Sequence, residues 1–247
     1  MVKTVILAGT NDKQDDVLLD KASCMIGGKM MIEYVIDALQ KSQCTDEILV
    51  VGNKEKLISL EKKWDIELMQ CNYSLVDNIL QGIKRFEGEQ VLISTSDIPM
   101  ITEEAVKDFV VKGQAADADL CYSIISKKIM IDTYPKAHRT YVKLKDGEFT
   151  GGNLFLLDST KTDRYAEIGK KMLLYRKKPW KMCRLLGFQF LLKLILGRLA
   201  ISDIEIRVSS MMDIKGKAIL CNYPEIGNDV DKPEDLELAK QYMTEIL

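Results

Sequence analysis

The stretch VKTVILAG (residues 2–9) decides the fold of this chain of 247 residues. Its first seven residues form a mainly apolar run, which is typical of a parallel strand covered by helices on both faces. A glycine follows directly, and a polar loop then leads to a helix predicted over residues 29–42. This order of strand, loop and helix indicates one repeating unit of an α/β sheet.

The same alternation of strands and helices continues along the chain. Further strands are predicted at residues 47–51, 66–69, 91–93, 119–125, 153–157 and 217–222. Helices are predicted at residues 74–85, from the N-cap Thr102 to about residue 112, and from Pro233 onward. We therefore expect an α/β fold with a mainly parallel, doubly wound sheet flanked by helices, in a single domain over residues 1–247.

Residues 160–215 interrupt this pattern and are predicted to form a helical insertion, in which Ser202 and Glu205 make a capping box. The stretch 182–201 (MCRLLGFQFLLKLILGRLAI) is the most apolar part of the chain, but three basic residues interrupt it. It is therefore a poor candidate for spanning a bilayer. It can pack on the main sheet, or it can provide a membrane-surface or dimer contact.

The composition argues against several classes of protein. Lys and Arg total 35 and Asp and Glu total 37, so the chain lacks the basic excess of a nucleic-acid-binding protein. Six scattered cysteines with one histidine and no C-x-x-C pair argue against a zinc site. Most of the cysteines lie in apolar runs and are predicted to be buried, and we expect a reducing compartment. The first residues read as a strand rather than a signal peptide. We therefore expect a cytoplasmic protein.

Polar residues follow the predicted strands at the edge where such sheets bind ligands. Gly9 and Lys21 follow the first strand, and Asp97 follows the strand at 91–93. A glycine lets the backbone approach a phosphate, a lysine neutralises phosphate charge, and a carboxylate suits Mg²⁺. Each feature can also be read as an ordinary surface loop or a strand-ending turn.

Three later segments carry further polar residues. Asp229 and Asp231 are predicted to point to one face of an extended segment, where two carboxylates repel each other unless a cation lies between them. Asp231 can instead cap the last helix together with Glu234. The turn at 151–153 offers close backbone contact and an asparagine, and the basic cluster at 136–139 is more often a solvated loop than an anion site.

Three segments together resemble the sugar-1-phosphate and molybdenum-cofactor guanylyltransferase-like nucleotidyltransferases. They are VILAG at 5–9 with Lys21 and GGKMMIEY at 27–34, then SDIPMI at 96–101, and DVDKPEDL at 229–236. The resemblance spans residues 1–158 and 216–247. It implies the Rossmann-like nucleotide-diphospho-sugar transferase fold.

The resemblance also implies an activity and a set of site residues. The expected enzyme is a magnesium-dependent nucleotidyltransferase that joins a nucleoside monophosphate from an NTP to a phosphorylated or other anionic acceptor and releases pyrophosphate. By resemblance, Lys21 and Asp97 act in catalysis, and Asp97, Asp229 and Asp231 bind Mg²⁺. The residues implied to contact the nucleotide are Leu7, Ala8, Gly9, Thr10, Ser74 and Asn78, and those implied to contact the acceptor are Gly152 and Asn153.

Two alternatives use the same residues. A nucleotide-sugar-dependent glycosyltransferase would need the same sheet edge and metal-binding aspartate. A non-catalytic nucleotide-binding or scaffold protein is suggested by the first loop, where Thr10 replaces the second glycine of the family and the usual arginine is missing. Four aspartates at 12, 15, 16 and 20 make this loop acidic, which is unfavourable beside a triphosphate unless cations compensate.

Overall fold

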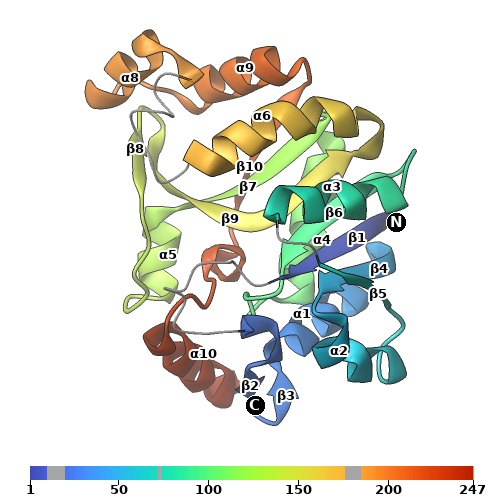
Figure 1. Ribbon diagram of the computed structural model, residues 1–247. Helices are drawn as coiled ribbons and strands as arrows, with labels where there is room; N and C mark the ends of the chain where they lie inside the picture. The colour runs from blue at the N-terminus through green and yellow to red at the C-terminus, as the bar shows by residue number, and fades with distance from the viewer. Residues whose placement is uncertain (10–19, 72–73, 176–184, 247) are drawn as a thin grey trace.

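The computed structural model describes residues 1–9, 20–71, 74–175 and 185–246 (Figure 1). Its main sheet is built from the strands β1 (Val2–Ala8), β4 (Thr45–Gly52), β5 (Glu67–Gln70), β6 (Gln90–Thr95), β7 (Leu120–Ser126), β8 (Val142–Leu144), β9 (Gly147–Asp158) and β10 (Gly216–Cys221). Seven of them follow the order β10-β7-β9-β6-β1-β4-β5, and β8 pairs with β9. The short strands β2 (Met25–Ile26) and β3 (Lys29–Met30) form a separate hairpin.

Parallel pairing dominates the sheet. Strand β1 runs parallel to β4 and β6, β4 to β5, and β10 to β7, whereas β9 runs antiparallel to β6, β7 and β8. The antiparallel direction of β9 matters for the site, because Gly151 pairs with Ile124 near the carboxyl end of β7. The beginning of β9 therefore joins the edge at which the parallel strands end.

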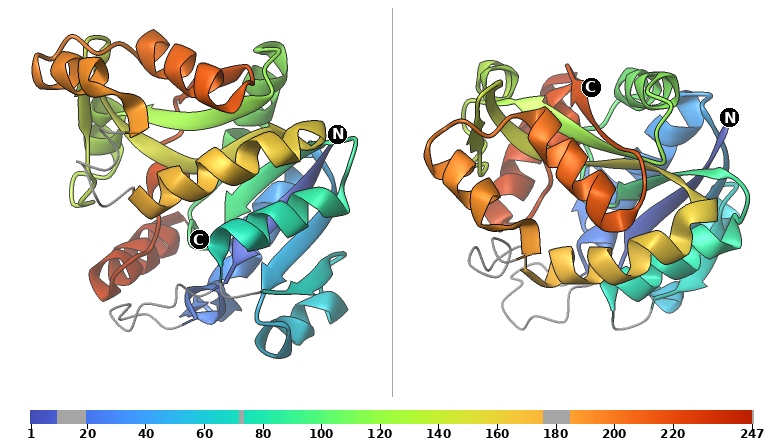
Figure 2. Two further views of the ribbon diagram at one scale, coloured as in Figure 1. Left: turned by 45° about the horizontal axis from the view of Figure 1, so that its top comes forward. Right: turned by 90° about the horizontal axis from the view of Figure 1, so that it is seen from above.

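Helices cover both faces of the sheet. They are α1 (Met31–Lys41), α2 (Lys54–Leu57), α3 (Leu75–Arg85), α4 (Glu103–Ala115), α5 (Lys127–Thr133), α6 (Thr162–Tyr175), α8 (Phe188–Ile195), α9 (Ile201–Met212) and α10 (Pro233–Ile246). Helices α1 and α4 pack on one face, and α3, α6 and α9 pack on the other (Figures 1 and 2). The predicted α/β class, with a mainly parallel sheet flanked by helices and helical residues between β9 and β10, is confirmed. None of the described helices is long and apolar enough to cross a membrane.

Local hydrogen bonds explain where the helices begin. Thr102 and Ser74 cap α4 and α3 as the sequence indicates. The first helix starts later than predicted, because Met30 is extended and its N–H donates to the Glu33 carboxylate at 2.8 Å.

The capping box predicted at Ser202 and Glu205 is wrong. Helix α9 begins at Ile201, and the carboxylate of Asp203 accepts from Ala200 N at 3.0 Å. Glu205 instead binds β10 through Ala218 N at 3.0 Å. Glu205 therefore accepts a hydrogen bond from the backbone of β10 instead of capping its own helix.

The cysteines are less uniformly buried than predicted. Cys121 and Cys221 are buried, and their thiol pKa values are raised by burial, to about 11 and about 12. Cys24, Cys44 and Cys71 are partly exposed. Cys183 lies outside the described residues.

Helix α3 comes very close to β1 at Gly82. A Cβ added to Gly82 would lie 2.7 Å from Val5 Cγ1. Val5 is fully buried, and its β-branched side chain has few rotamers available, so it cannot easily move aside. The missing side chain of Gly82 therefore sets how closely α3 approaches the strand that ends at Gly9.

We expect Gly82→Ala to lower the free energy of unfolding by about 1–3 kcal/mol through overpacking, although alanine favours helices more than glycine does. Gly169→Ala in α6 is the matched control, because an added Cβ there meets no atom within 4 Å. The control should gain about 0.5–1 kcal/mol. Urea unfolding measures both values, and an unchanged or more stable Gly82→Ala variant would contradict this packing argument.

Candidate active site

Two segments that are far apart in the sequence meet where β6 ends. Asp97 follows β6 directly, and β10 leads through η4 (Pro224–Gly227) into the extended residues 228–231. Val230 N donates to Asp97 O at 2.8 Å, and the Val230 side chain is buried. This single backbone contact places Asp229 and Asp231, which flank Val230, beside Asp97.

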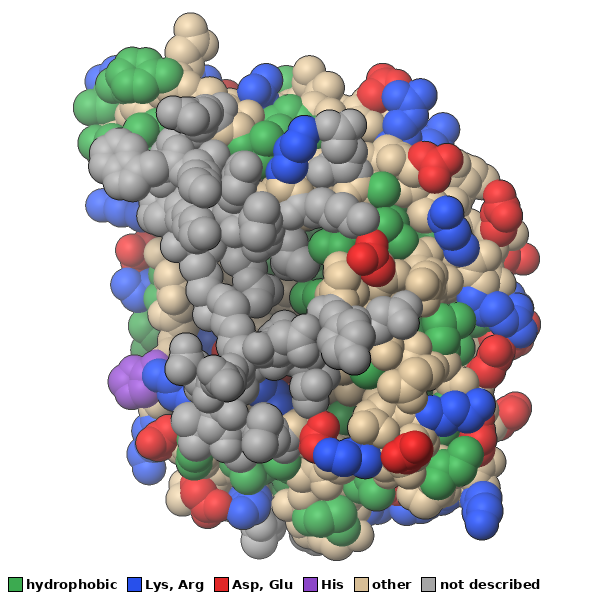
Figure 3. Space-filling model, viewed as in Figure 1, with side chains coloured by type: hydrophobic (Ala, Val, Ile, Leu, Met, Phe, Trp, Pro, Cys, Tyr) green, Lys and Arg blue, Asp and Glu red, His purple; other side chains and the backbone are tan. Residues whose placement is uncertain are grey.

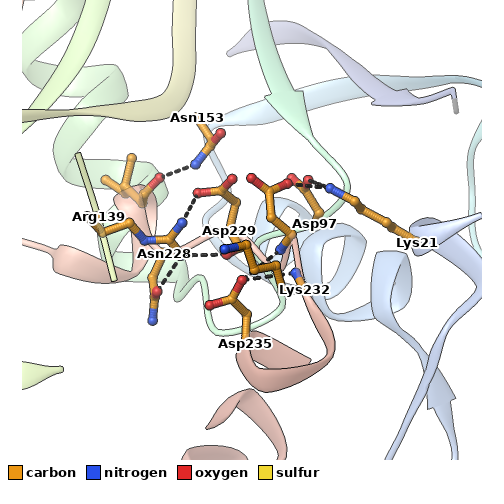
Figure 4. A network of polar contacts seen from close by, with 10 residues as sticks. Lys21, Asp97, Arg139, Asn153, Asn228, Asp229, Lys232 and Asp235 are labelled. Carbon is orange, nitrogen blue, oxygen red and sulfur yellow. Dashed lines mark hydrogen bonds and ion pairs between the residues drawn. The ribbon is translucent and has the colours of Figure 1, made fainter. Parts of the chain in front are cut away.

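The three carboxylates form a compact group. One oxygen from each of Asp97, Asp229 and Asp231 lies within 4.8 Å of the other two. Figure 4 shows Asp97 and Asp229 close together. Asp97 Oδ1 is buried and has no hydrogen-bond partner in good geometry among the described residues. Carboxylate oxygens are the hard ligands that suit a divalent cation such as Mg²⁺, and the partnerless Asp97 oxygen is compatible with such a ligand role.

Lys21 lies on one side of the carboxylates. It begins η1 (Lys21–Ser23), forms an ion pair with Asp231, and has its Nζ 3.5 Å from Asp97 Oδ2. Its side chain is only 16% exposed. A lysine held this firmly between two carboxylates supplies positive charge at the sheet edge, where a phosphate group would approach.

Arg139 lies on the other side. Its Nη1 donates to Asp229 Oδ1 and its Nη2 to Asn228 Oδ1, each at 2.6 Å, and Nη2 also contacts the backbone oxygen of Asp229. The side chain is 9% exposed. The interpretation of residues 136–139 as a solvated loop is therefore wrong for Arg139, because its side chain is largely buried and bonded to Asn228 and Asp229.

The electrostatics of the site follow from burial and from these two cations. Burial raises the pKa of Asp97, although Lys21 opposes the shift. Burial also raises the pKa of Asp229 to about 6, against the effect of Arg139 and with further repulsion from Asp97 and Asp231. Burial would raise the pKa of Asp231 too, but the hydrogen bond and charge of Lys21 outweigh it and the pKa is lowered. Additional positive charge at this position would favour all three carboxylates in the ionised form.

The residues predicted to contact a nucleotide gather at the end of β1. Gly9 is exposed there, and a Cβ added to it would lie 3.5 Å from Asn78 Nδ2. Ser74 caps the helix that carries Asn78 by accepting from Asp77 N at 3.3 Å. Leu7 and Ala8 are the last residues of β1, and Thr10 lies outside the described residues.

The residues predicted to contact the acceptor lie on β9. Asn153 Nδ2 donates to Ile226 O at 3.0 Å, and the residue lies close to the carboxylates in Figure 4. Gly152 is buried, and a Cβ there would overlap Ser123 Oγ and lie 2.8 Å from Ile226 Cγ2. Packing therefore accounts for this glycine, and a contact between Gly152 and substrate stays a prediction.

Sequence reasoning missed Tyr122 as well as the partners of Arg139. Tyr122 stacks on Phe155 with ring centroids 4.7 Å apart, and its hydroxyl fills the space that a side chain at Gly151 would need. Burial raises the pKa of Tyr122, with a further contribution from the charge of Asp229. The Gly151-Gly152 pair signalled a close contact, but nothing in the sequence could identify an aromatic residue on a neighbouring strand as its partner.

Comparisons with known proteins agree with this arrangement. A chain from Thermus thermophilus, described as a hypothetical transferase, is 34% identical, with a TM-score of 0.83 over 96% of this chain and 100% of that one. A CMP:2-keto-3-deoxy-manno-octonic acid synthetase complexed with CTP has a TM-score of 0.65 over 99% of this chain and 100% of that one. Its 13% identity supports a shared fold alone.

Sequence relatives cover less of the chain. A probable molybdenum cofactor guanylyltransferase from Natranaerobius thermophilus is 27% identical over 129 residues, which are 51% of this chain and 61% of that protein. The model of the MobA-like NTP transferase domain matches residues 4–182. Since that match covers well over half of the sequence, the chain belongs to the family of MobA-like NTP transferase domains.

Proposed function

We propose that this protein is a cytoplasmic nucleotidyltransferase. It would join a nucleoside monophosphate from an NTP to a phosphorylated or other small anionic acceptor and release pyrophosphate. The observation that carries this proposal is the group of three carboxylates between Lys21 and Arg139, at the sheet edge beside Gly9. Residues 1–247 would act as one domain, with the helices at 160–215 as an insertion.

Asp97, Asp229 and Asp231 are the residues that would hold Mg²⁺. A bound Mg²⁺ supplies charge neutralisation and orientation of the phosphates. Lys21 contributes a second positive charge next to the same position, and it can exchange its carboxylate partners for phosphate oxygens.

The protein needs to supply little proton transfer in this reaction. An anionic acceptor oxygen attacks the α-phosphorus, the bond from that phosphorus to the oxygen bridging it to the β-phosphate breaks, and pyrophosphate leaves with the electron pair. Positioning and charge stabilisation are then the main contributions of the chain. The backbone from Leu7 to Thr10, with Ser74 and Asn78, would hold the nucleotide, and Gly152 and Asn153 would contact the acceptor.

Two observations bear on the alternatives. Membership of an NTP transferase family favours nucleotidyl transfer over the nucleotide-sugar-dependent glycosyltransferase. The acidic first loop suggests a scaffold protein, but its last aspartate, Asp20, is paired with Lys56. Part of the negative charge that would repel a triphosphate is therefore already compensated.

We expect Asp97→Asn to lower pyrophosphate release by at least about 100-fold, because it removes a charge from the centre of the site. The assay supplies each of the four common NTPs with Mg²⁺ and a panel of phosphorylated and acidic sugars. Asp117→Asn is the control, since that exposed carboxylate precedes β7 at the opposite edge of the sheet and pairs with Lys215. Equal activity of Asp97→Asn and the parent would exclude this role for Asp97.

At least one NTP with Mg²⁺ should stabilise the protein, by about 2.7 kcal/mol at one hundred times its dissociation constant. Thermal unfolding measures this gain, and Lys21→Met should lose most of it because the triphosphate loses a cationic partner. Lys215→Met, at the opposite edge, should behave like the parent. If no NTP stabilises the protein, the scaffold alternative is favoured. Consumption of a nucleotide sugar would favour the glycosyltransferase.

Arg139→Leu should lower the free energy of unfolding by at most about 3–5 kcal/mol at pH 8, because it leaves the half-buried carboxylate of Asp229 without its cation. In the parent, the pKa of Asp229 is raised from 3.8 to about 6, so the folded state holds this proton more tightly than the unfolded state does. The contribution of Asp229 to the free energy of unfolding is therefore lost as the pH rises through about 6. Without Arg139 the pKa of Asp229 rises further. The loss of unfolding free energy in Arg139→Leu should therefore be smaller at pH 5, where Asp229 is protonated.

The double variant Arg139→Leu with Asp229→Asn tests the same point at constant pH. It should recover most of the stability lost in Arg139→Leu, since the carboxylate that Arg139 compensated has also been removed. Urea unfolding at pH 5 and pH 8 provides all the values. The same deficit at both pH values, without recovery in the double variant, would show that Arg139 acts through packing instead.

A further inference from the structure

Helix α8 presents a row of exposed apolar side chains. Phe188, Leu192, Ile195 and Leu196 are 73%, 41%, 72% and 58% exposed. Their spacing of four, three and one residues places them on one side of the helix. We call these four residues the α8 stripe. Four large apolar side chains together on one face require a partner more than scattered ones do.

The other side of α8 is fixed to the sheet. Phe190 and Leu194 pack against a cluster that contains Leu144 of β8 and Phe149 of β9. The prediction that the stretch 182–201 packs on the main sheet therefore holds for this inner side among the described residues. The outer side, the α8 stripe, is left at the surface.

The turn after α8 is fixed as well. Lys145 N donates to Leu199 O at 2.8 Å, and Ile201 N donates to Asp146 Oδ2 at 2.8 Å. These bonds attach the loop between α8 and α9 to the turn between β8 and β9. The stripe is thus displayed by a supported helix rather than by a free segment.

The sequence in and around α8 is rich in basic residues. From residue 168 to residue 202 the sequence contains nine Lys and Arg and no Asp or Glu, in a chain whose net charge is −2. Within the described part of this stretch, Lys193 and Arg198 are exposed on or next to α8. Figure 3 shows hydrophobic and basic side chains together at the corner where Figure 1 draws α8. An apolar face among basic residues is complementary to a surface with apolar chains beneath anionic headgroups.

A second copy of the chain fits this surface less well than a bilayer does. A two-fold symmetric contact through α8 would place the same patch on both sides of the interface. Lys193 and Arg198 would then face like charges, which is unfavourable. Lys193 is paired with Asp203 at 2.7 Å, so Arg198 contributes most of this repulsion. An anionic bilayer offers negative charge without this conflict.

The length of α8 limits the mode of contact. Eight residues of helix extend about 12 Å, against a hydrocarbon core of about 30 Å. The helix can therefore lie at the interface but cannot span it. We propose that the α8 stripe docks the protein on anionic lipid bilayers, with its apolar side chains at the acyl boundary and Lys193 and Arg198 at the headgroup phosphates. This inference does not depend on the proposed nucleotidyl transfer.

Vesicle flotation with the full chain tests the proposal. We expect the parent to float with phosphatidylcholine vesicles that contain phosphatidylglycerol, and to float much less with pure phosphatidylcholine or at high salt. The triple variant Phe188→Ser, Ile195→Ser and Leu196→Ser should lower the partition coefficient by at least about tenfold. Arg198→Gln should weaken only the binding that depends on anionic lipid.

The control is Val111→Ser, which removes a 54% exposed apolar side chain from α4 and should float like the parent. Circular dichroism and urea unfolding establish that each variant is folded. A parent that stays in solution with anionic vesicles, or a triple variant that floats as the parent does, overturns the proposal. A dimer in sedimentation velocity that disappears in the triple variant, without vesicle binding by the parent, overturns it in favour of a second copy.

Discussion

Three carboxylates can share a small, partly buried volume only if positive charge shares it with them. In this protein the positive charge comes from opposite sides, with Lys21 at Asp97 and Asp231, and Arg139 at Asp229. The pKa of Asp231 is lowered because Lys21 outweighs the effect of burial there. The pKa of Asp229 is raised because Arg139 does not outweigh it. Without the two cations, mutual repulsion would push the segments that carry the carboxylates apart.

The backbone makes this arrangement possible before any side chain contributes. Parallel strands bring the ends of β1 and β6 to one edge of the sheet. The antiparallel strand β9 brings residues 151–153 to the same edge. The hydrogen bond from Val230 to Asp97 then attaches the segment after β10. The apolar core on the two faces of the sheet stabilises these strands, so the charged groups meet on a rigid support.

Local patterns predicted the parts that depend on local physics. The buried strand at residues 2–8, the caps at Ser74 and Thr102, and the α/β class follow from apolar runs and from hydroxyl side chains that satisfy free N–H groups. The period of two in an extended chain also put Asp229 and Asp231 on one face. The assignment of these residues to metal binding and catalysis remains a prediction.

Parts that depend on distant partners could not be predicted in this way. Arg139 resembles any loop arginine until residues 228 and 229 fold against it, and Gly151 resembles any turn glycine until Tyr122 lies beside it. Glu205 had the spacing of a capping residue, but β10 provided a better partner. In each case the deciding atom lies on another element of the fold, which spacing along the chain does not encode.

The contact between Val230 and Asp97 also has a consequence for biosynthesis. The ribosome makes Asp97 132 residues before Asp229, so a growing chain can complete β1 and β6 while two of the three carboxylates do not yet exist. Over that interval Lys21 can pair with Asp97 but not with Asp231, and Arg139 has neither of its acidic-segment partners. The full set of charges comes together only after translation has passed residue 231, so a nascent polypeptide shorter than that cannot form the complete site.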